Sequence, residues 1–237
     1  MERTLVISDI HGCYREFVDL LEQACYHPQK DRLLLLGDYV SRGKDSQKVV
    51  SLVMSLVQEN RAIALQGNHD YRFYRVINNQ ASEKEIARFF EKGGEKTLQS
   101  YCKDISDDLG KARENIKAMY SLHLDFLKSL PFFYEDNDYI YVHAGINPQV
   151  SCLSQQKVQD LLNIKEEFYT KKTSVKKIVI FGHTVTKDIH GSYDIWLGGD
   201  KIGIDGGCSF GGQLNCLELV HGQVSRFYSS KFGGNDQ

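Results

Sequence analysis

Five short apolar runs in this chain each end in side chains that can bind a metal ion. The runs are TLVISD, RLLLLGD, AIALQGNH, YIYVHAG and KIVIFGH, and the polar residues at their ends are Asp9, His11, Asp38, Asn68, His69, His143 and His183. Carboxylates, an amide oxygen and imidazoles together suit divalent transition ions. A single histidine after a strand is more often structural, but the same pattern five times along one chain favours a metal site.

Near-continuous apolar runs of this length predict strands buried on both faces, as in α/β proteins. Sites in such sheets form outside the carboxyl ends of parallel strands, so the five runs would bring their polar ends together. Apolar residues at helical spacing predict helices over residues 14–25 and 46–57, between the first three runs. Near the end of the chain, Gly222 predicts a closing hairpin.

Between the third and fourth runs, the pattern predicts a helical insertion over about residues 71–130. In its second half, one amphipathic helix is expected to contain Ile116, Met119, Tyr120 and Leu124 and to end before Pro131. No low-complexity linker or repeat divides the 237 residues, and a chain of this length can bury one large core. We therefore expect a single domain over residues 1–237.

The composition limits the classes of partner. The formal net charge is −2 and charges of both signs are mixed, which excludes general nucleic-acid binding or membrane binding through charge. The first apolar run is too short for a signal peptide, so we expect a cytoplasmic protein. Six scattered cysteines without a C-x-x-C pair predict reduced thiols.

The strings DIHG, GDYVSRG, GNHD, HAG and FGHT, in this order, resemble the signature of the metallophosphoesterases. More narrowly they resemble the phosphoprotein phosphatase branch, which includes small bacterial Ser/Thr protein phosphatases and symmetrical diadenosine tetraphosphatases. The resemblance spans about residues 4–220. It implies the calcineurin-like fold, an α/β αββα sandwich of two mixed sheets, here with the helical insertion.

The resemblance also implies a centre of two divalent ions, with manganese expected and iron, zinc or nickel as alternatives. One ion would be held by Asp9, His11 and Asp38. The other would be held by Asp38, Asn68, His143 and His183, with Asp38 bridging the two. A hydroxide that bridges the ions would attack phosphorus directly, without a phosphoenzyme. Arg42 would grip phosphoryl oxygens, and His69 would protonate the leaving oxygen.

Three positions depart from the family pattern. Ser41 stands where the family usually has an aspartate that supports the catalytic histidine, so a supporting charge is missing unless Asp45 or Asp70 supplies it. Asp70 itself replaces a common glutamate. Lys165 stands where a second phosphate-binding arginine is expected, and lysine keeps the charge but loses the bidentate geometry.

Three functions remain open from the sequence. The first expectation is a phosphatase that hydrolyses phosphate monoesters in Ser/Thr phosphoproteins. A symmetrical dinucleoside tetraphosphate hydrolase is the enzyme alternative, and a non-catalytic phosphate-binding or scaffold protein is the alternative of another class. The expected partner is a phosphoprotein or a nucleotide-like phosphate, and the oligomeric state stays undetermined.

Overall fold

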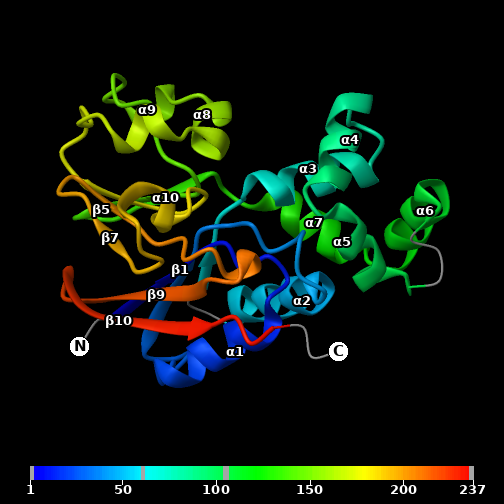
Figure 1. Cartoon of the computed structure of the whole chain (residues 1–237), viewed down its shortest axis with the longest axis horizontal. Coiled ribbons are helices and arrows are strands. Elements are labelled where there is room, and N and C mark those ends of the chain that lie inside the picture. Colours follow the sequence, from blue (N-terminus) through cyan, green and yellow to red (C-terminus); the bar gives the residue numbers. More distant parts are fainter. Residues whose placement is uncertain (1–2, 60–61, 104–106, 235–237) are drawn as a thin grey trace.

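Two five-stranded sheets form the centre of the computed structural model, which describes residues 3–59, 62–103 and 107–234 (Figure 1). The first sheet has the order β10-β9-β1-β2-β3 and contains β1 (Arg3–Ile7), β2 (Asp31–Leu35), β3 (Ala62–Ala64), β9 (Gln213–Val220) and β10 (Gln223–Lys231). The second has the order β4-β5-β6-β8-β7 and contains β4 (Phe133–Glu135), β5 (Tyr139–Val142), β6 (Ile178–Phe181), β7 (Trp196–Leu197) and β8 (Lys201–Gly203).

Both sheets are mixed. Strands β1, β2 and β3 are parallel to one another, and β9 and β10 extend that sheet in antiparallel pairing. In the second sheet β5, β6 and β8 are parallel, and β4 and β7 are antiparallel edge strands. All five predicted strands are present, but the fold divides them, three in one sheet and two in the other.

The sheets pack face to face, because alternate residues of each strand point to opposite sides. Val6 and Leu34 of the first sheet share one buried cluster with Tyr141 and Ile180 of the second. The intervening residues, such as Leu5 in β1, face away from that cluster toward the helices. This arrangement confirms the predicted αββα sandwich of two mixed sheets.

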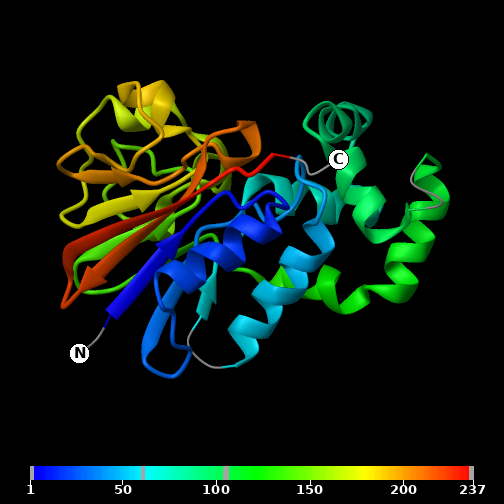
Figure 2. The same cartoon turned by 60° about the horizontal axis from the view of Figure 1, so that its bottom comes forward.

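Helices cover both outer faces of the sandwich. Helices α1 (Tyr14–Gln23) and α2 (Ser46–Gln58) pack on the first sheet and lie side by side in Figure 2. The second sheet is covered by α8 (Val158–Asn163), α9 (Glu166–Tyr169) and α10 (Thr186–His190). Within the described residues, no helix has the length and apolar character that crossing a membrane requires. All six cysteines are described, and all are free thiols, as predicted.

Among the described residues, five α-helices lie between β3 and β4 in the chain, and they pack beside the sandwich next to α2 in both views (Figures 1 and 2). They are α3 (Asn68–Ile77), α4 (Glu83–Glu91), α5 (Gly94–Tyr101), α6 (Leu109–Met119) and α7 (Ser121–Ser129). The prediction of one amphipathic helix through Met119 and Leu124 was wrong, because the chain leaves helical geometry at Tyr120, with φ −131° and ψ 32°. The Tyr120 ring packs edge-on against Tyr101 at 4.9 Å, and Met119 is 71% exposed.

The predicted hairpin is present at the end of the chain. Strand β9 pairs with β10 through a two-residue turn formed by His221 and Gly222. Both turn residues have positive φ, 52° and 72°, which is the geometry of a turn that matches the twist of the flanking strands.

Candidate metal centre and active site

The polar ends of the five predicted strands converge on the carboxylate of Asp38. Its Oδ2 lies 3.4 Å from Nε2 of His11 and 3.5 Å from Nε2 of His143. His143 Nε2 also lies 3.2 Å from Oδ1 of Asn68, and His11 Nε2 lies 3.9 Å from Oδ1 of Asp9. The fold thus brings together residues from both sheets, with Asp38 between the two histidines.

His183 joins the group from the end of β6. Its backbone N–H donates to Asp9 Oδ2 at 2.8 Å, and its ring lies 5.0 Å from the His143 ring. A cluster of Asp38, His143 and His183 has potential ligand atoms within 4.8 Å of one another. All six residues expected to bind metal therefore lie at one place.

Two of the histidines have their ring orientation fixed by the backbone. His11 Nδ1 lies 2.8 Å from the carbonyl oxygen of Val40, and His143 Nδ1 lies 3.0 Å from that of Leu36. A carbonyl only accepts, so each Nδ1 carries a proton and donates it. Each Nε2 then keeps a free lone pair facing Asp38, as a metal-binding imidazole requires.

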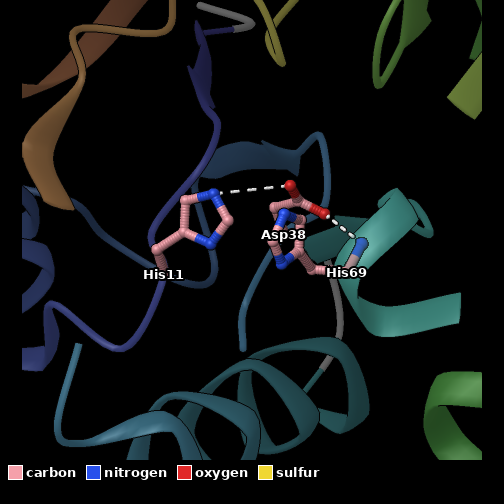
Figure 3. A group of neighbouring side chains, drawn as sticks. All are labelled: His11, Asp38 and His69. Carbon is pink, nitrogen blue, oxygen red and sulfur yellow. Dashed lines mark hydrogen bonds and ion pairs between the residues drawn. The ribbon is translucent and has the colours of Figure 1, made fainter. Parts of the chain in front are cut away.

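His69 lies on the other side of the same carboxylate (Figure 3). Its backbone N–H donates to Asp38 Oδ1 at 2.8 Å, and its ring packs edge-on against the His11 ring at 4.8 Å. Burial, followed by the charges of neighbours such as His11 and Arg42, lowers the pKa of His69. Burial and these charges thus disfavour the imidazolium form of His69.

The buried carboxylates at the centre would be stabilised by bound positive charge. Burial and the nearby Asp9 raise the pKa values of both Asp38 and Asp205. Burial lowers the pKa values of His11, His143 and His183, so imidazolium groups are disfavoured there. Divalent cations would satisfy carboxylates and neutral imidazoles together, so the donor set fits two such ions.

The backbone at the centre is strained in a way that the sequence pattern did not reveal. Six site residues adopt positive φ without being glycine: Asp9, His11, Asp38, Ser41, Arg42 and His183. Such conformations cost free energy and persist only where the surrounding structure imposes them, and they concentrate at functional sites. Gly67 allows a close approach of two backbone segments, since a Cβ there would lie 2.2 Å from the backbone nitrogen of Asp38.

Arg42 reaches the same centre from the loop after β2. Its Nη2 lies 3.4 Å from Nε2 of His69, and its guanidinium stacks on the ring of Phe210 at 4.1 Å. Its backbone N–H donates to the carbonyl of Gly93, where a Cβ would come within 2.8 Å of that nitrogen. The backbone, an aromatic face and His69 therefore fix the position of this side chain.

Neither the Ser41 hydroxyl nor the two candidate substitutes for the missing acid form a hydrogen bond with the His69 ring in the described structure. The Ser41 hydroxyl is buried and has no hydrogen-bond partner in the described structure, while its backbone N–H donates to Thr97. Asp70 accepts backbone N–H groups of Asp38 and Tyr39, at 2.7 and 2.9 Å, and burial and Asp38 raise its pKa to about 7. Asp45 pairs with Lys48 at 2.8 Å. Neither aspartate supplies the supporting carboxylate.

A cavity of about 310 Å³ opens at the metal-ligand set. Its wall is formed in part by Asp9, His11, Asp38 and His183, together with Arg42 and Lys165. Further residues that we did not predict line it as well, among them Asp205, Tyr193 and Phe210. Asp205 could have been found, because the run KIGID is another short apolar strand that ends in a carboxylate. The sequence carries no comparable signal for Tyr193 or Phe210.

The chain matches a protein family and several relatives over most of its length. The family described as calcineurin-like phosphoesterase matches residues 2–202. The asymmetrical bis(5'-nucleosyl)-tetraphosphatase PrpE of Anoxybacillus flavithermus is 30% identical over 239 residues, which cover 90% of this chain and 88% of the relative. The symmetrical bis(5'-nucleosyl)-tetraphosphatase of Marinomonas sp. is 31% identical, and the match covers 69% of this chain and 50% of that relative.

Solved structures share the fold at low sequence identity. A crystal structure of a putative diadenosine tetraphosphatase has a TM-score of 0.72 and 20% identity, and the match covers 98% of this chain and 94% of that one. A protein serine/threonine phosphatase from Saccharomyces cerevisiae has a TM-score of 0.61 and 15% identity, with 99% and 81% coverage. At these identities the likeness supports the two-sheet fold alone.

Proposed function

Because the chain belongs to the calcineurin-like phosphoesterase family, whose members are metal-dependent phosphoester hydrolases, we propose that it cleaves dinucleoside tetraphosphates. The observation that carries this proposal is the match over nearly the full length of relatives named as asymmetrical bis(5'-nucleosyl)-tetraphosphatases. The symmetrical relatives are matched over about half of their length. The comparisons thus favour the alternative of a tetraphosphatase over the protein phosphatase that we expected first. They also favour asymmetric cleavage.

Two divalent ions would be held by the set that converges on Asp38, with manganese as the expected metal. Asp9, His11 and Asp38 would hold one ion, and Asp38, Asn68, His143 and His183 the other. Asp205 would add negative charge beside Asp9. When bound, such ions activate water for in-line attack and offset the charge on the phosphoryl oxygens.

Arg42 binds the phosphoryl group in this proposal. Its fork of N–H donors suits a pair of phosphoryl oxygens, and its stacking on Phe210 holds the fork in place before substrate arrives. Lys165 lines the same cavity and contributes a second positive charge without bidentate geometry. Arg42 and Lys165 would thus both lie beside the negatively charged phosphoryl group that is transferred.

The absence of an acid at residue 41 fits a phosphoanhydride better than a phosphoserine. A general acid matters most when the leaving oxygen is a strong base, as the alkoxide of serine is. A nucleotide leaving group is a much weaker base and departs with little help. His69, whose ring contacts neither Asp45 nor Asp70, has no carboxylate to stabilise its protonated form, so it would serve better as the proton donor for a tetraphosphate than for a phosphoserine.

The walls of the cavity also suit a nucleoside. Phe210 is 58% exposed, and together with Tyr193 it lines the opening next to the metal ligands. Exposed aromatic faces bind nucleobases by stacking, which contributes about 1–3 kcal/mol per base. A base placed there would lie next to the phosphates that Arg42 and Lys165 hold.

The test is product analysis with the Mn²⁺-loaded protein. Diadenosine tetraphosphate should yield AMP and ATP, separated by ion-exchange chromatography, and the Asp38→Asn variant should be inactive. Two molecules of ADP would assign the symmetrical reaction instead. Hydrolysis of phosphoserine peptides without hydrolysis of diadenosine tetraphosphate would overturn the proposal, and binding without any turnover would indicate the non-catalytic alternative.

A further inference from the structure

A second cavity borders the metal centre at Asn68. Its volume is about 340 Å³, and it lies between α3, α4 and α8. Asn68 and Asn163 form the wall nearest the centre, and the Nδ2 of Asn68 lies 3.5 Å from the Oδ1 of Asn163. Arg72 and Arg88 form part of the rest of the wall. The lining of this second cavity thus includes one expected metal ligand and two arginines.

Arg72 is a buried arginine that has no partner in the structure described. Only 9% of the residue is exposed, yet its guanidinium makes no hydrogen bond or ion pair with any described residue. Buried charged groups are normally paired, because an unpaired one loses its hydration without compensation. The guanidinium of Arg72 therefore lacks an anion.

The one carboxylate that lines this cavity is already engaged elsewhere. Glu85 accepts a hydrogen bond from Nη2 of Arg75 at 3.2 Å and forms an ion pair with Nε of the same residue at 3.1 Å. It also accepts hydrogen bonds from the backbone and hydroxyl of Ser82 at 2.9 Å each. Burial, followed by the charge of Arg88, lowers the pKa of Arg72, while the charges of Asp38 and Glu85 act in the opposite direction. Among the described residues, the second cavity is thus lined by two guanidinium groups and by one carboxylate that is already paired.

The two cavities are close enough to serve one substrate. Asn68 lines the second cavity, and its Oδ1 lies 3.2 Å from Nε2 of His143, which in turn lies 3.5 Å from Oδ2 of Asp38. Asp38 lines the first cavity, so the two cavities meet at the proposed metal ligands, with Arg42 in one lining and Arg72 in the other. An extended anion could have one phosphate at the centre and another beside Arg72.

We propose that Arg72 and Arg88 form an anion subsite for a phosphate of the substrate other than the one being hydrolysed. The assignment of this anion to a polyphosphate chain rests on the proposed function. The subsite would distinguish a polyphosphate, which has further phosphates to place there, from a simple monoester. Arg72 supplies the buried charge, and the exposed Arg88 supplies a second cation at the opening.

The test compares substrates in the Mn²⁺-loaded enzyme. The Arg88→Gln variant should raise KM for diadenosine tetraphosphate by about fivefold or more, because a charge-assisted contact is lost. Its kcat and KM for an aryl phosphate, which has no second phosphate, should stay within about twofold. The Arg72→Lys variant keeps a charge in the buried position but loses the bidentate geometry, so it should show a smaller split in the same direction with less risk to folding. Lys84→Gln is the matched control, because Lys84 is exposed on the same helix and does not line the cavity.

A second measurement separates this inference from the proposed function. Inorganic tripolyphosphate and orthophosphate are tested as inhibitors of aryl phosphate hydrolysis at fixed free Mn²⁺. Arg88→Gln should weaken inhibition by tripolyphosphate about fivefold and leave inhibition by orthophosphate unchanged, even if diadenosine tetraphosphate proves not to be a substrate. Equal effects of Arg88→Gln and Lys84→Gln on both inhibitors would overturn the subsite. An effect of Arg88→Gln that is confined to the hydrolysis of acidic phosphopeptides would also overturn the subsite.

Discussion

The guanidinium of Arg42 lies over the ring of Phe210, with 4.1 Å between its central carbon and the ring centroid. The two residues are far apart in the sequence and belong to the loops after β2 and after β8. Such a contact restricts the arginine side chain before it meets a phosphate, and it keeps the N–H donors free because stacking uses the face of the guanidinium.

Removal of this aromatic face should weaken substrate binding. In the Phe210→Ala variant we expect KM for an aryl phosphate to rise about two- to fivefold, because an exposed cation–π contact contributes about 0.5–1 kcal/mol. The increase should be larger for diadenosine tetraphosphate, which also loses a stacking face for its base. Phe210→Tyr should restore both values. Phe227→Ala, which removes an exposed aromatic residue from β10, is the control; if it has the same effect, the stacking explanation is wrong.

The missing acid can be restored at residue 41. The backbone there has φ 75°, a left-handed conformation that aspartate and asparagine tolerate better than most residues. If protonation of the leaving group limits turnover, Ser41→Asp should increase kcat about threefold or more for aryl phosphates with poor leaving groups. Diadenosine tetraphosphate should gain little.

The control for residue 41 is Ser41→Asn, which has nearly the same shape as Ser41→Asp but no charge. A series of aryl phosphates of graded leaving-group basicity gives the slope of log kcat against that basicity. The slope should become shallower in Ser41→Asp alone. An unchanged rate on the poorest leaving groups would show that His69 does not need the supporting charge.

Metal removal should affect stability as well as activity. Without cations, the Asp9, Asp38 and Asp205 carboxylates repel one another in a buried site. Chelation should therefore abolish hydrolysis and lower the melting temperature by roughly 5–10 °C, because a ligand at 100 times its Kd stabilises by about 3 kcal/mol. Added Mn²⁺ should restore both, measured by differential scanning fluorimetry with metal analysis. A melting temperature that does not respond to Mn²⁺ would contradict the two-ion centre.

The ion pair between Arg3 and Asp31, away from the metal centre, should account for part of the protein's loss of stability in acid. Burial would raise the pKa of Asp31, but hydrogen bonds from Arg3 and from the backbone of His27 lower it below its ordinary value of 3.8. The stabilisation is present above the unfolded pKa and is lost as the pH falls through the folded one. Asp31→Asn should thus cost about 1–3 kcal/mol at pH 7 and less at pH 3, below the unfolded pKa, measured by urea unfolding.

Asp125→Asn serves as the control for Asp31, since Asp125 is an exposed carboxylate on α7. It should change the free energy of unfolding by less than about 0.5 kcal/mol at either pH. A loss in Asp31→Asn that is the same at pH 7 and pH 3 would mean that packing, and not the charge of Asp31, stabilises this part of the protein.

The sequence by itself determined the strands and most of the residues at the centre. A buried strand needs a continuous apolar run, and its end is where polar residues can begin, so the pattern locates Asp38 or His143 without a structure. Local chemistry also determined the hairpin at Gly222, because a two-residue turn requires positive φ. The helix break at Tyr120 was missed, since the apolar spacing continues through it.

Only the tertiary structure decided what these residues contact. Asp70 was a possible support for His69, but the fold directs its carboxylate to the backbone of Asp38 and Tyr39. The stacking of Phe210 on Arg42 and the unpaired charge of Arg72 likewise have no signature in the sequence. The physical reason is that periodicity records only whether a side chain is buried or exposed. Which partner it meets there depends on how distant segments pack, and that packing makes Asp38 the common neighbour of two histidines from different sheets.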